Sequence, residues 1–466
     1  MLAEDILYLP VHELGNRIRA KQISPVELTE SYLARSERVG PKLNAYVTIT
    51  RDLALEQARV AEKQIAAGHY RGPLHGIPYA AKDLLAVKGY PTTWGAKPYA
   101  NQKFDYNATV IERLNQAGAV LIGKAAMIEL AGGMNYRYAS ASLTGAAKNP
   151  WSEGCWTCGS SSGSGAIVSA ALAAFAIGTE TWGSIICPSA YCGISGLRPT
   201  FGRVSRYGAM ALAYSLDKIG PMARAAEDCG LILSAIAGHD SLDRSSLPPE
   251  QAAFSISGKP SGSLKIGVLT NAWDKPDPEI KAAFETAIGV LRQHGANVSD
   301  AKLPEGPFEI AAGLLVGVEG AAAFRSLIES GRVAELADPL GQIGGYVNEQ
   351  ISASDYMRAL QIRGIFQKKV DALFDEFDVV AAASLPIAAT TLETNLETDL
   401  TFSDPLGGIG NLSGLPAISV PCGFTSKMLP AGIQFVSRAR NDAAVFAAAS
   451  MFQSHTDWHL KRPPIA

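Results

Sequence analysis

Two glycine-rich loops that carry serines lie at either end of one apolar segment. Residues 159–165 read Gly-Ser-Ser-Ser-Gly-Ser-Gly, and residues 178–184 read Gly-Thr-Glu-Thr-Trp-Gly-Ser. Glycines beside a serine let backbone N–H groups converge on one point and bring the hydroxyl close to a substrate carbonyl, as an oxyanion hole and a nucleophile require. By composition alone, two flexible turns are the simpler interpretation, because Gly and Ser are common loop residues.

Two nucleophile motifs match locally but lack their context. Residues 159–163 fit the G-x-S-x-G elbow with Ser161 at its centre, yet such an elbow needs a buried strand before it. The preceding segment, 151–158, is polar and interrupted by Gly154, so we disfavour this scheme. Residues 215–218 fit S-x-x-K, but the chain has no Ser-Asp-Asn or Lys-Thr-Gly motif to complete that kind of site.

A third scheme, in which a lysine is the base, rests on a long and ordered series of motifs. The series lies at 76–83, 149–208, 215–221, 411–424 and 429–434, and so covers most of the chain. In this order the motifs resemble those of the amidase signature family. That family includes the A subunit of the tRNA-dependent glutamine amidotransferase, amide hydrolases that act alone, and carbamate-splitting relatives.

The resemblance implies a Ser-Ser-Lys triad. Lys82 follows the Gly-Ile-Pro motif at the end of a predicted strand, Ser160 opens the first glycine loop, and Ser184 ends the second as the nucleophile. One predicted helix and two loops separate Ser160 from Ser184, which allows the two hydroxyls to meet at the same end of that helix. The family also implies a cis peptide between Gly159 and Ser160, a conformation that is expensive outside proline.

The expected chemistry depends on protonation. Lys82 can act as a base only if burial lowers its pKa towards neutrality, because an ammonium has no lone pair. Neutral Lys82 would take a proton from Ser160, and Ser160 would take one from Ser184 as the Ser184 oxygen attacks the amide carbonyl. The reverse relay protonates the leaving amine. Water then hydrolyses the acyl-enzyme. The family's oxyanion-hole donors are the backbone N–H groups of Thr181, Trp182, Gly183 and Ser184.

Three positions depart from the commonest family pattern. Trp182 replaces a usual glycine, Ile186 replaces a common arginine, and Cys158 replaces another glycine. The expected surroundings of the triad are therefore bulkier and less polar, and Trp182 either narrows the acyl pocket or forms its wall. These substitutions argue against glutamine as the substrate and favour an amide with an apolar or aryl part.

Three functional hypotheses follow. The first is a stand-alone amidohydrolase that cleaves a small aryl or apolar amide, and also a carbamate or ester, through an acyl-enzyme on Ser184. The alternative is an A-type subunit of a tRNA-dependent Asn/Gln amidotransferase, whose glutaminase releases ammonia for a partner enzyme. A third interpretation, motivated by Trp182, is a binding or scaffold protein with a decayed site.

Cysteine and histidine spacing allows a weaker metal hypothesis. Four cysteines, at 155, 158, 187 and 192, could in principle close a zinc site, but the second pair has loose spacing. We interpret them as small buried residues, because free cysteine is among the most buried residue types. His455 and His459 have helical spacing, which more often marks a solvated terminal helix. The sequence therefore predicts neither a metal nor a cofactor.

Composition and charge restrict the kinds of partner that the chain is expected to bind. Of the 466 residues 47% are hydrophobic and 18% charged, which excludes overall disorder, and the formal charge of −3 draws the chain to neither nucleic acid nor an anionic membrane. A small-molecule amide is the expected partner, and a homodimer is left open. The Glu4-Asp5 pair and the absence of a long apolar stretch indicate a cytoplasmic protein with no signal peptide or membrane span.

Alternating helical and strand patterns predict an α/β fold. The resemblance implies one large amidase-signature fold over 1–466, with a central mixed twisted sheet covered by helices on both faces, a catalytic core at about 72–225 and a surface excursion at about 238–263. Helices are expected at 12–38 (two), 53–67, 108–116, from the first glycine loop to 174, and at 278–293, and strands at 43–50, 76–81, 119–123, 265–270, 378–383, 417–421 and 432–436.

Overall fold

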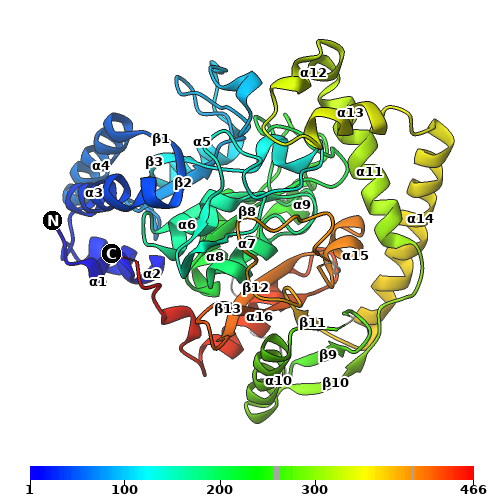
Figure 1. The fold of residues 1–466 in the computed structure, drawn as a ribbon. Coiled ribbons are helices and arrows are strands. Elements are labelled where there is room, and N and C mark those ends of the chain that lie inside the picture. The colour runs from blue at the N-terminus through cyan, green and yellow to red at the C-terminus, as the bar shows by residue number, and fades with distance from the viewer. Residues whose placement is uncertain (256–262, 274, 401–403, 466) are drawn as a thin grey trace.

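A large mixed β-sheet forms the centre of the computed structural model, which describes residues 1–255, 263–273, 275–400 and 404–465 (Figure 1). Its strands are β1 (Tyr46–Ile49), β2 (Pro78–Lys82), β3 (Val120–Ala125), β6 (Phe175–Glu180), β7 (Ser195–Arg198), β8 (Lys218–Ala223), β9 (Lys265–Leu269), β10 (Asn297–Ala301), β11 (Val379–Ala383), β12 (Ala417–Phe424) and β13 (Pro430–Val436). Their order is β1-β3-β2-β6-β8-β7-β12-β13-β11-β9-β10. Strands far apart in the sequence are therefore neighbours in the sheet.

The sheet contains both kinds of strand pairing. β2 pairs in parallel with β3 and with β6, and β9 pairs in parallel with β10 and β11. The pairs from β6 through β8, β7, β12 and β13 to β11 are antiparallel, as is β1 with β3. The expectation of an α/β fold with a mixed central sheet is confirmed.

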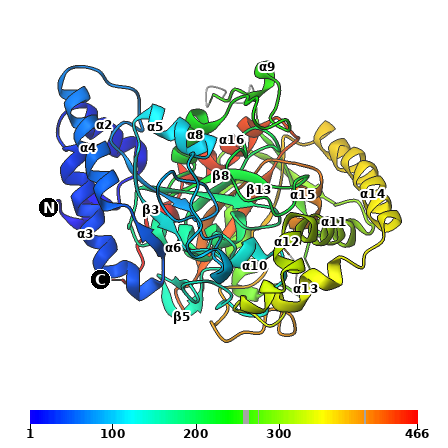
Figure 2. The ribbon, with the colours of Figure 1, turned by 90° about the horizontal axis from the view of Figure 1, so that it is seen from above.

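The N-terminal helices pack together at one end of the molecule (Figures 1 and 2). They are α1 (Glu4–Leu7), α2 (Val11–Arg19), α3 (Pro25–Leu43) and α4 (Arg51–Ala66). Ser24 caps α3 by accepting from the backbone N–H groups of Val26 and Glu27, and Pro25 occupies the first helical position, as its sequence predicts. Both ends of the described chain lie here, joined by an ion pair between Arg462 and Asp5.

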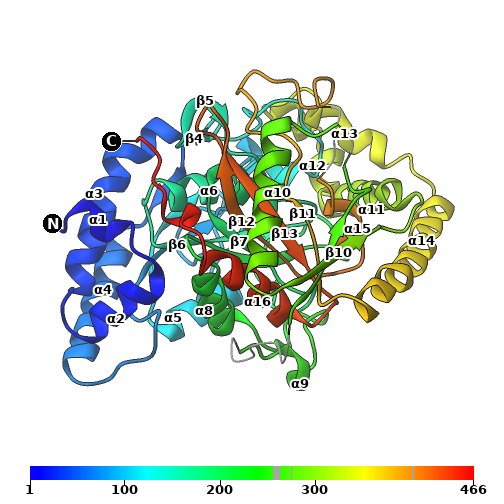
Figure 3. The ribbon, with the colours of Figure 1, turned by 90° about the horizontal axis from the view of Figure 1, so that it is seen from below.

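Further helices flank the sheet. They are α5 (Thr109–Ala117), α6 (Ser162–Ser169), α7 (Ile186–Cys192), α8 (Ala226–Ile236), α9 (Pro249–Ala252), α10 (Pro278–Gln293), α11 (Phe308–Ala323), α12 (Arg325–Glu329), α13 (Gly341–Asn348), α14 (Ala353–Asp371), α15 (Gly407–Leu412) and α16 (Asp442–Gln453). α6 and α7 contact each other and the central strands, whereas α10 and α16 lie across β12 and β13 (Figure 3). α11, α14 and α15 contact one another at the side away from the N-terminal helices. Within the described ranges, no helix combines the length and apolar character needed to span a bilayer.

Several predicted elements are correct, and one helix prediction is wrong. The helix at 278–293 is α10, and the strand at 76–81 is β2 shifted by two residues at its start and one at its end. The helix expected to reach residue 174 ends at Ser169, and Phe175–Glu180 form β6. Residues 170–174 are buried and apolar but form a turn before β6, so hydrophobicity alone does not mark where the helix ends. β7, β8, α11 and α14 were not predicted.

The segment before residue 159 contains a strand after all. β5 (Ser152–Trp156) pairs with β4 (Lys148–Asn149) in a separate two-stranded hairpin outside the main sheet. Most residues of β5 are partly or fully exposed. The buried strand that a nucleophile elbow requires is therefore still lacking before Ser161.

A buried ion pair joins the residue after β2 to β3, beside the predicted lysine base. Lys124 Nζ lies 2.7 Å from Asp83 Oδ1, and neither side chain is exposed. The other oxygen of Asp83 accepts from the backbone N–H of Thr93 at 3.0 Å and from the Thr93 hydroxyl. Asp83 therefore has its own partners, and Lys82 is free to point elsewhere.

Substitution of Lys124 tests the importance of this pair. Lys124→Met should lower the free energy of unfolding by about 3–5 kcal/mol, because it leaves Asp83 buried without its cation. Urea denaturation followed by fluorescence measures the change. Arg325→Met, which removes an exposed ion pair with Glu329, is the control and should leave the midpoint near that of the wild type. Equal midpoints for the two variants would contradict the prediction.

Candidate active site

Lys82 ends β2 inside the protein. Its side chain is fully buried, and its Nζ lies 2.7 Å from Ser160 Oγ and 2.9 Å from Thr179 Oγ1. Burial lowers the pKa of the ammonium from 10.5 to about 7, although the negative charges of Asp217 and Glu180 oppose this shift. A lysine with this pKa is in large part uncharged near neutral pH, as a lysine base requires.

Ser160 lies in the loop that leads into α6. The peptide bond between Gly159 and Ser160 is cis, which confirms that expectation. The next serine, Ser161, has a different environment, because its hydroxyl donates to the carbonyl of Thr179 at 3.1 Å and accepts from the N–H of Thr179 at 3.2 Å. Ser161 is buried and committed to the backbone, so the elbow scheme finds no support in its geometry.

Ser184 lies beside the first loop but does not hydrogen-bond to Ser160. Its backbone carbonyl accepts from the N–H of Ser161 at 3.4 Å, which ties the two glycine loops together. Among the described residues its hydroxyl has no hydrogen-bond partner, and the residue retains 7% exposure. The structure thus brings Lys82 and Ser160 into contact and leaves the Ser184 hydroxyl available to a ligand.

The turn from residue 181 to 184 presents unused backbone donors. Gly183 has a φ of +76°, which glycine adopts without strain. Among the described residues, the N–H groups of Trp182, Gly183 and Ser184 have no acceptor. Backbone N–H groups that are fixed and unpaired can stabilise a developing oxyanion, provided that they converge on it.

Glu180 holds the far end of this turn. Its Oε2 accepts from the backbone N–H groups of Ile185 and Ile186 at 2.8 and 3.0 Å, and its Oε1 pairs with Arg198 at 2.7 Å. Burial alone would raise the pKa of Glu180, but Arg198 and these donors outweigh it and hold the pKa below 4.5. Glu180 is thus a buried anion that fixes the start of α7.

An apolar cavity of about 330 Å³ adjoins both loops. We call it the aromatic cavity, and its lining is Tyr136, Trp156, Cys158, Gly159, Trp182, Cys187, Tyr191, Leu385, Thr390, Leu396, Leu400 and Asp404. Gly159 precedes Ser160, and Trp182 lies two residues before Ser184, so the cavity borders the two serine loops. None of these lining residues is a lysine or an arginine.

Trp182 occupies a slot between two glycine-bearing helices. A Cβ added at Gly407 of α15 would lie 2.5 Å from the indole Nε1, and one at Gly408 would lie 3.3 Å from Cζ2. Gly313 of α11 leaves 3.8 Å to the same ring. The indole therefore forms a wall of the aromatic cavity, which is one of the two arrangements that the sequence suggested.

The other two positions that depart from the family pattern, Cys158 and Ile186, lie in different surroundings. Cys158 lines the aromatic cavity, and its backbone has a φ of +63°. Ile186 is fully buried in an apolar cluster with Leu406 and Ile409 and does not line that cavity. Ile186 therefore affects the packing of the interior rather than the lining of the cavity.

Asp404 is a cavity residue that sequence reasoning missed. Gln434 Nε2 and the backbone N–H of Leu406 donate to its Oδ1 at 3.0 and 3.1 Å. Burial raises the pKa of Asp404 to about 6, more than these hydrogen bonds lower it. Asp404 also contacts Cys187, which lies more than two hundred positions earlier in the chain. No local spacing could have indicated this contact.

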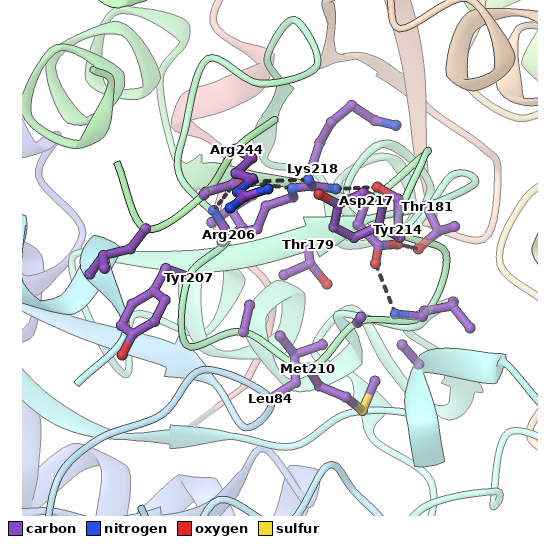
Figure 4. A pocket seen from close by; sticks show the side chains of 17 residues that line it. Leu84, Thr179, Thr181, Arg206, Tyr207, Met210, Tyr214, Asp217, Lys218 and Arg244 are labelled. Atoms are coloured by element: carbon purple, nitrogen blue, oxygen red, sulfur yellow. Dashed lines mark hydrogen bonds and ion pairs between the residues drawn. The ribbon is translucent and has the colours of Figure 1, made fainter. Parts of the chain in front are cut away.

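A second cavity, of about 370 Å³, opens between β8 and the loop at 206–214 (Figure 4). We call it the β8 cavity. Thr179 lies near the middle of its lining, while Arg206, Tyr207 and Asp217 stand around it. Thr179 is also a hydrogen-bond partner of Lys82, so this cavity extends close to Lys82, and it shares no lining residue with the aromatic cavity.

The cysteines do not assemble a metal site. Across the described part of the chain, no group of three or more His, Cys, Asp or Glu side chains is placed to hold a metal ion. Cys187 and Cys192 are buried, whereas Cys155 and Cys158 are partly exposed. Burial also raises the pKa of Cys192, which disfavours the thiolate that zinc requires.

Comparison with known proteins identifies the family. The family model described as Amidase matches residues 27–446. The chain belongs to the amidase signature family. It is 35% identical to the A subunit of the glutamyl-tRNA(Gln) amidotransferase of Geobacter sp. strain M21, with 99% of this chain and 100% of that protein aligned.

Solved amidase structures have the same fold. The peptide amidase of Stenotrophomonas maltophilia superposes with a TM-score of 0.84 at 28% identity, covering 98% of both chains. A 6-aminohexanoate cyclic dimer hydrolase superposes with a TM-score of 0.85 at 26% identity, covering 98% of this chain and 99% of the other. The chain is accordingly a hydrolase of carbon–nitrogen bonds.

The raised pKa of Asp404 makes a stability prediction. The folded state favours the neutral carboxyl of Asp404. Its contribution to the free energy of unfolding is therefore complete below pH 3.8 and is lost as the pH rises through about 6. Asp404→Asn cannot ionise and keeps an acceptor for Gln434, so it should raise stability at pH 8 by on the order of 1–3 kcal/mol.

Thermal melts at pH 4 and pH 8 measure this difference. The gain over the wild type should be large at pH 8 and small at pH 4, whereas the exposed control Asp105→Asn should show no such dependence. A gain of the same size at both pH values would contradict the assignment.

Proposed function

We propose that this amidase is a stand-alone serine amidohydrolase that cleaves a small amide with an aryl or apolar part through an acyl-enzyme on Ser184. The observation that carries the proposal is the buried contact of 2.7 Å between Lys82 Nζ and Ser160 Oγ, beside a Ser184 hydroxyl that has no hydrogen-bond partner in the described part of the chain. A lysine with a pKa of about 7 can accept a proton from Ser160 at neutral pH. The same acyl-enzyme chemistry would serve carbamates and esters.

The proposed reaction needs one small movement. When Ser184 Oγ attacks the carbonyl carbon, it forms a C–O bond and passes its proton to Ser160, whose own proton goes to Lys82. Breakdown returns the proton to the leaving nitrogen as the C–N bond breaks, and water then cleaves the ester. Because Ser184 has no hydrogen bond to Ser160 in this structure, its hydroxyl must rotate or approach Ser160 when substrate binds.

The aromatic cavity supports an apolar substrate. Trp156, Trp182 and Tyr191 supply ring surfaces, and leucines fill much of the remaining wall. Apolar walls with few polar groups favour a ligand that is itself largely apolar. Asp404 supplies one polar group, which can accept a hydrogen bond from an N–H of the substrate when it is ionised.

The second candidate is a glutaminase subunit of a tRNA-dependent amidotransferase. It is favoured by the 35% identity to a protein of that kind over 99% of this chain. Against it stands the aromatic cavity, because none of the described residues that line it is a lysine or arginine that could pair with the α-carboxylate of glutamine. We therefore rank it second.

Substitution of Ser184 tests the proposed nucleophile. Ser184→Ala should lower amide turnover by at least about 10³-fold and abolish labelling by a fluorophosphonate probe, because the attacking oxygen is gone. Amine release is measured with a panel of anilides, primary amides, carbamates and glutamine. Ser162→Ala, a buried serine at the first residue of α6, is the control and should retain both signals.

Two outcomes would decide against this assignment. Substantial turnover by Ser184→Ala would remove Ser184 as the nucleophile. Absence of both turnover and labelling in the wild-type protein would favour the decayed site. Preference for glutamine over every anilide would instead favour the glutaminase of a tRNA-dependent amidotransferase.

Substitution of Trp182 tests the proposed specificity. Trp182→Gly keeps the backbone N–H but removes the wall, so kcat/KM for small aryl amides should fall by about 10–100-fold while bulkier acyl groups become better tolerated. Competition assays between paired amides measure the change in preference. Tyr106→Ala, at the surface, should leave the preference unchanged. An unaltered preference in Trp182→Gly would mean that the indole does not contact substrate.

A further inference from the structure

One carboxylate lies directly against the turn that carries the unused donors. Asp217, immediately before β8, accepts from the Thr181 hydroxyl through Oδ1 at 2.5 Å. Both side chains line the β8 cavity, where Figure 4 shows them facing each other. Hydrogen bonds to an ionised carboxylate are shorter and stronger than those between neutral groups. Thr181 is the first residue after β6, so this contact holds the turn at its beginning.

Asp217 is itself held by the backbone. The N–H of Leu212 donates to its Oδ2 at 2.8 Å, and the N–H of Ala213 lies 3.1–3.2 Å from both oxygens. In return, the N–H of Asp217 donates to the carbonyl of Ala213 at 2.9 Å. Burial raises the pKa of this carboxyl above its usual value, and the donors from Thr181, Leu212 and Ala213 oppose this shift only in part. These bonds close the loop at 212–217 into a compact turn, so the carboxylate that reaches Thr181 has little freedom to move.

The turn at 181–184 is therefore fixed from both ends. Asp217 holds the side chain of Thr181, while Glu180 holds the backbone N–H groups of Ile185 and Ile186 on the other side. Between these anchors lie the N–H groups without acceptors. A donor group that is fixed before the reaction stabilises the oxyanion without a reorganisation cost.

We propose that Asp217 is a positioning residue, whose hydrogen bond to Thr181 fixes the turn that supplies the oxyanion-hole donors. The inference rests on the proposed function, because it assigns a task to the 181–184 turn in that reaction. Asp217 touches neither of the two serines nor Lys82 by any hydrogen bond within the described residues. It acts through Thr181.

The same carboxylate has an electrostatic effect that a purely structural contact would lack. The charges of Asp217 and Glu180 raise the pKa of Lys82 against the larger effect of burial. Other charged groups nearby are already paired, since Asp83 binds Lys124 and Glu180 binds Arg198. Removing the charge at Asp217 should therefore lower the pKa of Lys82 and extend activity to lower pH.

The cation next to Asp217 does not cancel this effect. Lys218 follows it at the start of β8, and its Nζ contacts the carbonyl of Leu216. Burial lowers the pKa of Lys218 well below its usual value, which favours its uncharged form. Figure 4 shows its side chain directed away from the group of Thr179, Thr181 and Asp217.

Two substitutions separate the two effects of Asp217. Thr181→Val removes the hydroxyl but keeps the charge, so kcat should fall by about 10-fold or more with KM little changed and the acid limb of the kcat/KM profile unmoved. Asp217→Asn keeps an acceptor for Thr181 but removes the charge, so the acid limb should move to lower pH by a few tenths of a unit to about one unit. Thr181→Ser, which retains the hydroxyl, should restore kcat.

The control lies in the same cavity. Asp243 also lines the β8 cavity, but its carboxylate pairs with Arg206 at 3.2 Å and does not contact the turn. Asp243→Asn should leave the acid limb where it is in the wild type. The profiles are measured with the best amide of the panel, after circular dichroism and melting have shown that each variant is folded.

Distinct results would overturn the inference and the function on which it rests. Full activity in folded Thr181→Val, or an unmoved acid limb in Asp217→Asn, would overturn the role of Asp217 while leaving Ser184 as the nucleophile. Retention of activity by Ser184→Ala would instead overturn the proposed function itself. An equal shift of the limb in Asp243→Asn would mean that any negative charge in the β8 cavity has this effect, and would also count against a specific role of Asp217.

Discussion

The arrangement of the whole site depends on one buried amine that has no carboxylate of its own. Lys82 sits beside Asp83 in the chain, and an ion pair between the two would keep the lysine charged. Lys124 prevents this by pairing with Asp83 from the adjacent strand, so Lys82 turns to the hydroxyls of Ser160 and Thr179. The ion pair between Lys124 and Asp83 thus leaves Lys82 without a carboxylate partner, so that Lys82 stays uncharged enough to accept a proton.

The sheet explains why distant segments meet at that amine. β6 lies between β2 and β8, so the end of β2 with Lys82 is next to Thr179 of β6. The loops that leave these strands then converge, although the serines come from a different part of the chain than the lysine. Buried carboxylates hold these loops in place. Burying a carboxylate costs free energy unless the group is fully hydrogen-bonded, as Glu180 is.

Sequence reasoning reached those features that are encoded locally or by motif. The cap at Ser24 and helix α10 follow from patterns within short windows, whereas the contact between Lys82 and Ser160, 78 positions apart, was expected from the resemblance to the amidase signature family. Asp404 escaped prediction because its contacts join segments far apart in the chain, and the glycine slot around Trp182 depends on how α11 and α15 pack. β6 was missed because a strand buried on both faces lacks an alternating pattern.

The slot around the indole also constrains how this enzyme can diverge. Gly407 has no room for a methyl group while a tryptophan stands opposite it, and Gly408 has very little. In an amidase with glycine at the position of Trp182, these two sites of α15 lose their contact with the indole, although a Cβ at Gly407 would still lie 2.7 Å from Asp404 Oδ2 and one at Gly408 2.9 Å from Glu309 Cγ. Residues on either side of this wall should therefore have changed together during evolution, and their covariation would record which lineages exchanged one pocket shape for another.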